Sequence, residues 1–199
     1  RELLQATESI FRWLNNQRRE AFPNMTLVVK DTYYEKAIAA MIDEVVDEAG
    51  QVKDSASTDL ARIRHSLYRK RQELRRTFEK VVARLNKAGY TADICESFSN
   101  GRRVIAILSE YKRQIKGVFH GESDSRRTTF MEPEETTELN NQVYELENEE
   151  LKEVQKILRA LTASLSVYAP LLETYYRIIG LYDFIRAKAM LGIDMQANL

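Results

Sequence analysis

Residues 101–133 read GRRVIAILSEYKRQIKGVFHGESDSRRTTFMEP and decide the fold of this chain. Apolar, β-branched and aromatic residues gather in three short runs, at 103–108, 115–120 and 128–131, each of which predicts a strand. Glycine and small polar residues separate the second and third runs and favour turns. No other part of the chain reads as β-structure, so the sequence predicts a small sheet of three or four strands.

Two long amphipathic segments flank this stretch. Apolar residues in 58–87 recur every three or four positions, at Leu60, Ile63, Leu67, Leu74, Phe78, Val81 and Leu85. The segment 134–166 repeats the pattern, at Leu139, Val143, Leu146, Val154, Ile157, Leu161 and Leu165. A seam of two apolar residues per heptad is typical of a coiled coil, and Ser57 is a suitable N-cap for the first helix. We therefore expect an antiparallel two-helix stalk of ~45 Å, at 1.5 Å per residue, with the sheet at its tip.

The residues before the stalk predict two more helices. Residues 3–16 have helical apolar spacing, which Pro23 and its neighbours interrupt. The short apolar run 25–29 is compatible with either a strand or a packed loop. Asp31 or Thr32 can cap a second helix over 33–48, which Gly50 would end.

A last helix is predicted from Pro170 onward, because proline is favoured in the first helical turn. Its residues are apolar on nearly all sides, which predicts burial in a bundle with the first two helices.

The predicted fold class is mostly α with a small β insert. We divide the chain into a helical core at 1–57 and 167–199, an outgoing helix at 58–90, a β-rich insert at 91–133 and a returning helix at 134–166.

Composition excludes several function classes. Cys95 is the only cysteine, so neither an internal disulfide nor a cysteine zinc site is possible. His65 and His120 each stand alone, without a metal-binding motif, and the phosphate-binding motifs G-x-x-x-x-G-K-[ST] and G-x-G-x-x-G are missing. We therefore expect no catalytic residues, no metal and no cofactor in this segment. No apolar run is long enough for a membrane span and the first residues are unlike a signal peptide, so we expect a cytoplasmic protein without a membrane partner.

Charge is segregated although Lys+Arg and Asp+Glu both number 30. Residues 62–127 contain 17 basic and seven acidic residues, and the helix that follows is acidic. Cations at turns and strand ends suit contact with phosphates. The sequence predicts that nucleic acid is bound by Arg102, Arg103, Lys112, Arg113, Lys116, His120, Arg126 and Arg127. The alternative is an ordinary charged surface.

Short motifs spread over residues 42–189 carry a family resemblance. They include GQV at 50–52, DSAS at 54–57, KGVFH at 116–120, TFMEP at 129–133, ELNN at 138–141 and DFIRAKA at 183–189. These motifs resemble the second-type bacterial MutS proteins, paralogues that lack the mismatch-recognition domains and usually end in a small Smr nuclease domain. The chain departs from the family pattern at Ala106, where the family has proline, at Arg126-Arg127, where it has Gly-Ala, and at Thr129, where it has leucine.

The resemblance implies a fragment that holds core helices, a lever and a clamp. In MutS-like proteins the clamps lie at the lever tips and close around DNA in a dimer. An ATPase domain that uses ATP and Mg and drives self-association is expected beyond residue 199. The family is linked to branched DNA and suppression of recombination, and also to rescue of collided ribosomes, so DNA and ribosomal RNA both stand as ligands. The rival interpretation is a structural module, whose stalk dimerises or transmits motion and whose insert contacts protein.

Overall fold

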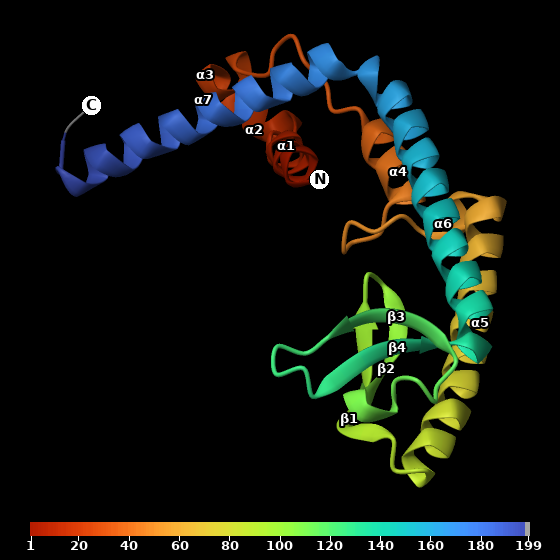
Figure 1. Ribbon diagram of the computed structural model, residues 1–199. Helices are drawn as coiled ribbons and strands as arrows, with labels where there is room; N and C mark the ends of the chain where they lie inside the picture. The colour runs from red at the N-terminus through yellow and green to blue at the C-terminus, as the bar shows by residue number, and fades with distance from the viewer. Residues whose placement is uncertain (198–199) are drawn as a thin grey trace. The chain divides into compact units, whose positions relative to one another are not determined.

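The computed structural model describes residues 1–197 and divides the chain into two compact units. One, here the sheet unit, is Asp54–Lys156, and the other, the helical unit, comprises Arg1–Lys53 and Ile157–Leu199. Helices dominate and the strands form one antiparallel sheet, so the predicted fold class is confirmed (Figure 1).

The sheet unit contains four strands in the order β1-β2-β4-β3. Their bounds are Thr91–Ser99 for β1, Arg102–Leu108 for β2, Gly117–Glu122 for β3 and Thr128–Pro133 for β4. The three predicted strands are confirmed with shifts of one or two residues, and β1 was missed. Its sequence TADICESFS mixes acidic and small polar residues that are depleted in strands, and its pairing with β2 is irregular between Thr91 and Glu96.

Both long helices are confirmed at the predicted bounds, as α5 (Thr58–Lys87) and α6 (Glu134–Ser166). The Ser57 hydroxyl caps α5 by accepting from the backbone N–H groups of Asp59 and Leu60. All seven seam positions of α5 are buried. Leu67 and Leu74 pack with Val143 of α6, while the sheet packs on the later turns of α5 through Phe78, Val81, Leu85, Ile105, Ile107 and Met131.

Ion pairs between α5 and α6 show that the helices run antiparallel. Arg64 pairs with Glu150, Arg71 with Glu147 and Arg84 with Glu135, so partner numbers fall as residue numbers rise. The acidic face of α6 is thus partly a counterface for the bases of α5.

The helical unit contains α1 (Glu2–Trp13), α2 (Asn16–Ala21), α3 (Pro23–Leu27), α4 (Lys36–Val45) and α7 (Ala169–Asp194). Leu4, Ile38 and Tyr175 form one buried cluster, and Leu14, Val29 and Ile178 form another. Both clusters join α7 to the N-terminal segments.

Residues 25–29 were predicted to be a strand or a packed loop, and for 25–27 both predictions were wrong. These residues belong to the short helix α3 (Pro23–Leu27), which has proline at its first position, and a turn follows it. The second helix is shorter than predicted: it begins at Lys36, and Glu35 is the N-cap in place of Asp31 or Thr32. The cause is a distant side chain. The Tyr175 hydroxyl donates to Tyr33 O at 2.9 Å and accepts from Glu35 N at 2.8 Å, which fixes 33–35 outside the helix.

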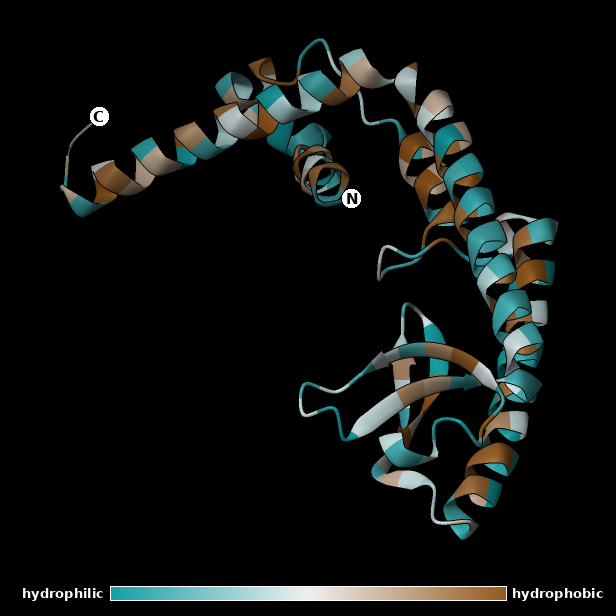
Figure 2. Ribbon diagram, viewed as in Figure 1, coloured by the Kyte–Doolittle hydropathy of each residue, from teal (hydrophilic) through white to brown (hydrophobic). Residues whose placement is uncertain are grey.

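The prediction that the last helix is buried all round was wrong. Among the described residues, only Tyr175 and Ile178 of α7 are buried, whereas Tyr176, Phe184 and Leu191 are 73%, 61% and 59% exposed. The N-terminal segments cover one side of α7, and Figure 2 shows hydrophobic residues along its whole length. None of the helices within residues 1–197 combines the length and apolar character needed to cross a membrane.

Candidate nucleic-acid interface

Three strand ends meet at one edge of the sheet. Leu108 at the end of β2 pairs with Thr128 at the start of β4, and Glu122 at the end of β3 pairs with Thr129. The loops that follow these strands, residues 109–113 and 123–127, therefore lie at the same edge, here called the loop edge. The β3–β4 turn projects away from α5 and α6 (Figure 1).

The β3–β4 turn is held by hydrogen bonds of Ser123. Its N–H donates to Thr128 O at 2.8 Å, its carbonyl accepts from Arg126 N at 2.8 Å and its hydroxyl accepts from Thr128 N at 3.2 Å. Ser109 N donates to Arg127 O at 3.0 Å, and this hydrogen bond ties the loop 109–113 to the β3–β4 turn. Arg126 and Arg127 are therefore presented on an ordered backbone.

Exposed cations gather at the loop edge. Arg113, Arg126 and Arg127 are exposed, and none has an ion pair within the described part of the chain. Lys112 differs, because its Nζ lies 2.9 Å from Glu122 Oε1. Lys116 is also exposed but lies at the other end of β3, where its carbonyl accepts from Glu134 N.

Arg102 and His120 instead surround a buried carboxylate. Glu132 is 1% exposed and accepts from Arg102 Nη1 at 2.8 Å, Asn140 Nδ2 at 2.9 Å and His120 Nε2 at 2.7 Å. A buried charge with this many partners is stable, but it becomes costly when one partner is removed. This network joins β2, β3 and β4 to α6.

Asn140 also extends the hydrogen bonding of β2. Its Oδ1 accepts from Arg103 N and its Nδ2 donates to Arg103 O, both at 3.2 Å. The neighbouring strand β4 ends at Pro133, which has no N–H to donate, so the amide side chain takes the place of a strand partner. The Arg103 guanidinium lies 5.4 Å from the Phe78 ring and 5.5 Å from the Phe98 ring, and it pairs with Glu96.

The eight residues predicted to bind nucleic acid thus have two environments. Three carry side chains held in contacts within the unit, namely Arg102, Arg103 and His120, and Lys112 is half-exposed in an ion pair. The other four are exposed without an ion pair among the described residues, namely Arg113, Lys116, Arg126 and Arg127. That any of the eight binds nucleic acid stays a prediction.

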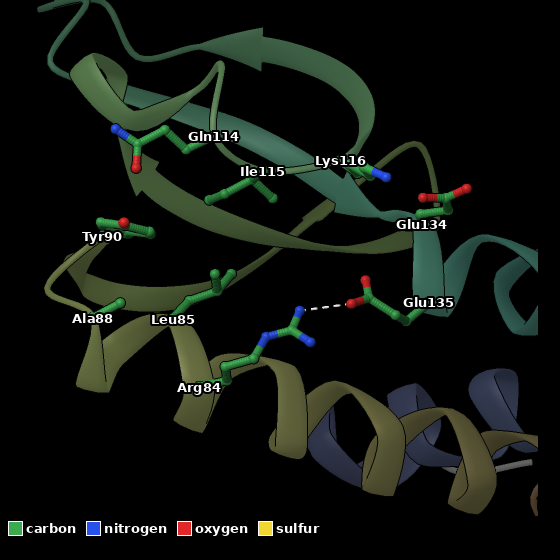
Figure 3. Close-up of a pocket in the computed structure, with 9 residues that line it drawn as sticks. All are labelled: Arg84, Leu85, Ala88, Tyr90, Gln114, Ile115, Lys116, Glu134 and Glu135. Atoms are coloured by element: carbon green, nitrogen blue, oxygen red, sulfur yellow. Dashed lines mark hydrogen bonds and ion pairs between the residues drawn. The ribbon is translucent and has the colours of Figure 1, made fainter.

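A cleft of about 490 Å³ opens between the end of α5 and the start of α6 (Figure 3). Its walls include Leu85, Tyr90 and Ile115, and Arg84 Nη2 lies 2.6 Å from Glu135 Oε1. The hydrogen bond from Arg84 holds the pKa of Glu135 below its usual value, against the opposing effect of burial. Lys116 and Glu134 also line the cleft, so both signs of charge meet there and the loop edge is the more cationic surface. No three His, Cys, Asp or Glu side chains of the described residues are grouped to hold a metal ion.

Sequence reasoning missed the Glu132 network and the role of Asn140. The available signal was an acidic residue inside the apolar strand run Thr-Phe-Met-Glu-Pro, because a buried acid needs cationic or amide partners. Those partners come from β2, β3 and α6, which the sequence did not place around one point.

No model of a known protein family matches this chain. Curated relatives are named endonuclease MutS2. The protein from Carboxydothermus hydrogenoformans is 30% identical over 196 residues, which is 98% of this chain and 25% of that protein. The protein from Listeria welshimeri is 34% identical over 89% of this chain and 22% of its own length, and that from Enterococcus faecalis is 35% identical over 78% and 20%. The chain is therefore related to part of MutS2 proteins and spans a quarter or less of their length.

Proposed function

We propose that this chain is the non-catalytic lever and clamp part of a MutS-like, DNA-binding protein of the cytoplasm. In this proposal the paired helices α5 and α6 are the lever, the sheet is the clamp, and the loop edge grips DNA. The observation that carries it is a group of exposed cations on loops that hydrogen bonds hold in place, Arg113, Arg126 and Arg127, which form no ion pair with any residue that the structure describes. The names of the relatives are consistent with a nucleic-acid substrate.

The chemistry of the loop edge suits phosphate rather than base recognition. Arginine guanidinium groups bind phosphate oxygens, and no aromatic ladder accompanies them for stacking on bases. Binding should therefore be independent of sequence and strongly dependent on salt. For three phosphate contacts we expect a slope of about −2.7 for log K against log salt concentration.

The parent protein supplies the remaining parts of this function. We infer that it self-associates and binds ATP and Mg outside this segment, so that two clamps close around one DNA. Two linked weak sites bind far more tightly than one, and branched recombination intermediates are the DNA form we propose. Ribosomal RNA presents the same phosphates and is the alternative ligand, in rescue of collided ribosomes.

The test is to neutralise the loop edge by changing Arg113, Arg126 and Arg127 to Gln in the full 199-residue chain. We expect weaker binding to fluorescent duplex and four-way-junction DNA, with a salt slope smaller by two to three units, about 0.9 per lost contact. The matched control changes Arg12, Arg62 and Arg177 to Gln, since these exposed arginines pair with acids on their own helices. Equal losses in both variants, or no loss in either, would count against the clamp. Tighter, equally salt-dependent binding to ribosomes than to DNA would favour the alternative.

A protein-interaction module is the second candidate, and one observation favours it. The exposed apolar side chains of α7 include Tyr176, Phe184 and Leu191. Such a group is more typical of a surface covered by another protein than of a surface that faces solvent. If the loop-edge variant binds DNA as the original chain does, but loses self-association in analytical ultracentrifugation, this second function stands in place of the first.

A further inference from the structure

Four basic residues form a row along one face of α5. Arg69, Arg76, Lys80 and Lys87 recur at intervals of seven, four and seven residues, and all four are exposed. With 3.6 residues per turn, they fall within about 40° of one another around the helix axis. The buried seam that includes Leu67, Leu74 and Leu85 lies about half a turn away. We call these four residues the outer row.

The outer row has no acidic partner among the described residues, although the rest of α5 is well paired. The helix has only three acids, and each pairs with a base outside the row: Asp59 with Arg62, Glu73 with Lys70 and Glu79 with Arg75. The acids of α6 pair with three others, Arg64, Arg71 and Arg84. Every base of α5 outside the row is therefore paired with an acid, and no base within the row has an ion pair to another residue of 1–197.

Such a row disfavours the isolated helix. Arg76 and Lys80 are four residues apart, and like charges at this spacing destabilise a helix. Exposed helices usually relieve this by interleaving acids and bases. The acid nearest the row, Glu73, lines the same surface hollow as Arg69, Arg76 and Lys80, but its carboxylate pairs with Lys70. An anionic partner that neutralises the row removes this unfavourable term.

The row fits the backbone of a duplex. Its ends, Arg69 and Lys87, are 18 residues apart, which is about 27 Å along the helix, or about three quarters of one turn of B-DNA. The helix that carries the row is held by packing against α6 and the sheet. Tyr68 is the only exposed aromatic residue of α5, so the stacking platforms that hold single strands are missing.

The row also faces away from the sheet. Phe78, Val81 and Leu85 direct the opposite side of α5 onto β2 and β4. A DNA duplex held at the loop edge would therefore leave the outer row accessible to a different segment of duplex DNA.

We propose that the outer row is a second DNA-binding surface, which takes a duplex segment distinct from the one at the loop edge. The sheet unit then bridges two duplexes, as a branched or crossed DNA requires. Only the bridging rests on the proposed function of the loop edge, because the row would bind duplex DNA without it.

The test changes Arg69, Arg76 and Lys80 to Gln in the full chain, and Gln has a helix propensity close to that of Arg and Lys. The matched control changes Arg62, Lys70 and Arg75 to Gln, which removes the same charge from the same helix at paired positions. In the assay, a biotinylated 20-base-pair duplex on beads is saturated with protein, and capture of a second, fluorescent duplex is measured across salt concentrations. Far-ultraviolet circular dichroism confirms that α5 remains folded in both variants.

We expect the row variant to retain the first duplex and to lose most capture of the second, with the salt slope of capture smaller by two to three units. The control should capture nearly as well as the original chain. Undiminished capture by the row variant, or equal loss in the control, overturns the proposal. Capture of duplex RNA without capture of duplex DNA also overturns it. So does a row variant that loses salt-sensitive self-association but still captures the second duplex.

The loop-edge variant separates the two proposals. If it fails to reduce binding while the row variant does, the outer row stands and the clamp falls. The reverse result removes the outer row and leaves the clamp.

Discussion

Arg126 adopts a backbone conformation that its side chain disfavours. Its φ is 54°, in the left-handed region, at the third residue after Ser123 in the β3–β4 turn. The family pattern that the sequence resembles has glycine at this place, and glycine adopts such a φ without steric cost. Arg126 thus combines a strained backbone with an exposed cation, and such strain is concentrated at functional sites.

We predict that Arg126→Gly stabilises the chain by about 0.5–1 kcal/mol while it weakens DNA binding. The left-handed conformation costs a residue with a Cβ about 1–2 kcal/mol, and the greater freedom of glycine in the unfolded chain offsets part of that gain. Urea unfolding measures the first effect and salt-dependent DNA binding the second. Arg126→Ala is the control, because it removes the charge but keeps the strain. If the alanine variant is stabilised as much as the glycine variant, backbone strain is not the cause.

We predict that Glu132→Leu destabilises the chain by about 3–5 kcal/mol, because it leaves the half-buried Arg102 guanidinium without its carboxylate. The double variant Glu132→Leu with Arg102→Met should recover a large part of the loss, since it removes the unpaired charge as well. Urea unfolding of both variants gives the comparison, with Glu149→Gln as an exposed acid on α6 for reference. A double variant as unstable as the single one would show that packing rather than charge pairing is what Glu132 supplies.

The sequence predicts which site residues are exposed better than it predicts which of them contact one another. Arg126 and Arg127 were predicted to be accessible, and they are, because turn residues lie at the surface whatever their partners. Arg102 and His120 were placed in the same predicted site on composition alone. Their side chains contact Glu132, and that contact depends on the pairing of β2 and β3 with β4, which a single sequence leaves open.

At the scale of elements, the first turn of α6 holds a pair that responds to pH. Arg84 donates a hydrogen bond to Glu135 and lowers the pKa of that carboxyl. A carboxyl with a folded pKa below its unfolded value of about 4.3 stabilises the fold fully above that value. The stabilisation is lost as the pH falls through the folded pKa.

We therefore predict that Glu135→Gln lowers the free energy of unfolding at pH 7 by less than ~1 kcal/mol, since both side chains are well exposed. The difference from the original chain should shrink toward zero below pH 4. Urea unfolding across pH 3–7 measures it. Glu134→Gln serves as the control, because Glu134 is in the same helical turn and has no ion pair among the described residues. An equal effect at Glu134 would assign the result to the helix dipole instead.

Elements with a local cause were predictable. The bounds of α5 and α6 follow from the apolar seam and from Ser57, all visible within each segment. The start of α4 was not, because the Tyr175 hydroxyl binds Tyr33 and Glu35 from α7, some 140 residues away. β1 was missed because its pairing with β2, rather than its own composition, makes it a strand.

At the scale of the whole molecule, zero net charge conceals two cationic surfaces. The sequence has an excess of bases over 62–127, and the structure divides them into paired residues, the loop edge, the outer row and the separate Lys116. This division depends on which acids of α5 and α6 come within reach. Composition alone therefore predicts that some anion is bound and leaves open where.

The two surfaces should act independently on a short duplex and together on a branched one. We predict that either triple variant alone retains binding of a 10-base-pair duplex at the other site, because the association constants of two separate sites add, and that only the combined variant loses it. On a four-way junction, whose arms can occupy both sites at once, either triple variant alone should remove most of the gain from double attachment. Fluorescence anisotropy on the original chain, both triple variants and their combination completes the cycle. Loss of short-duplex binding in either triple variant alone would mean that the two surfaces form one continuous site. A junction bound no more tightly than the short duplex would mean that only one of the surfaces holds DNA at a time.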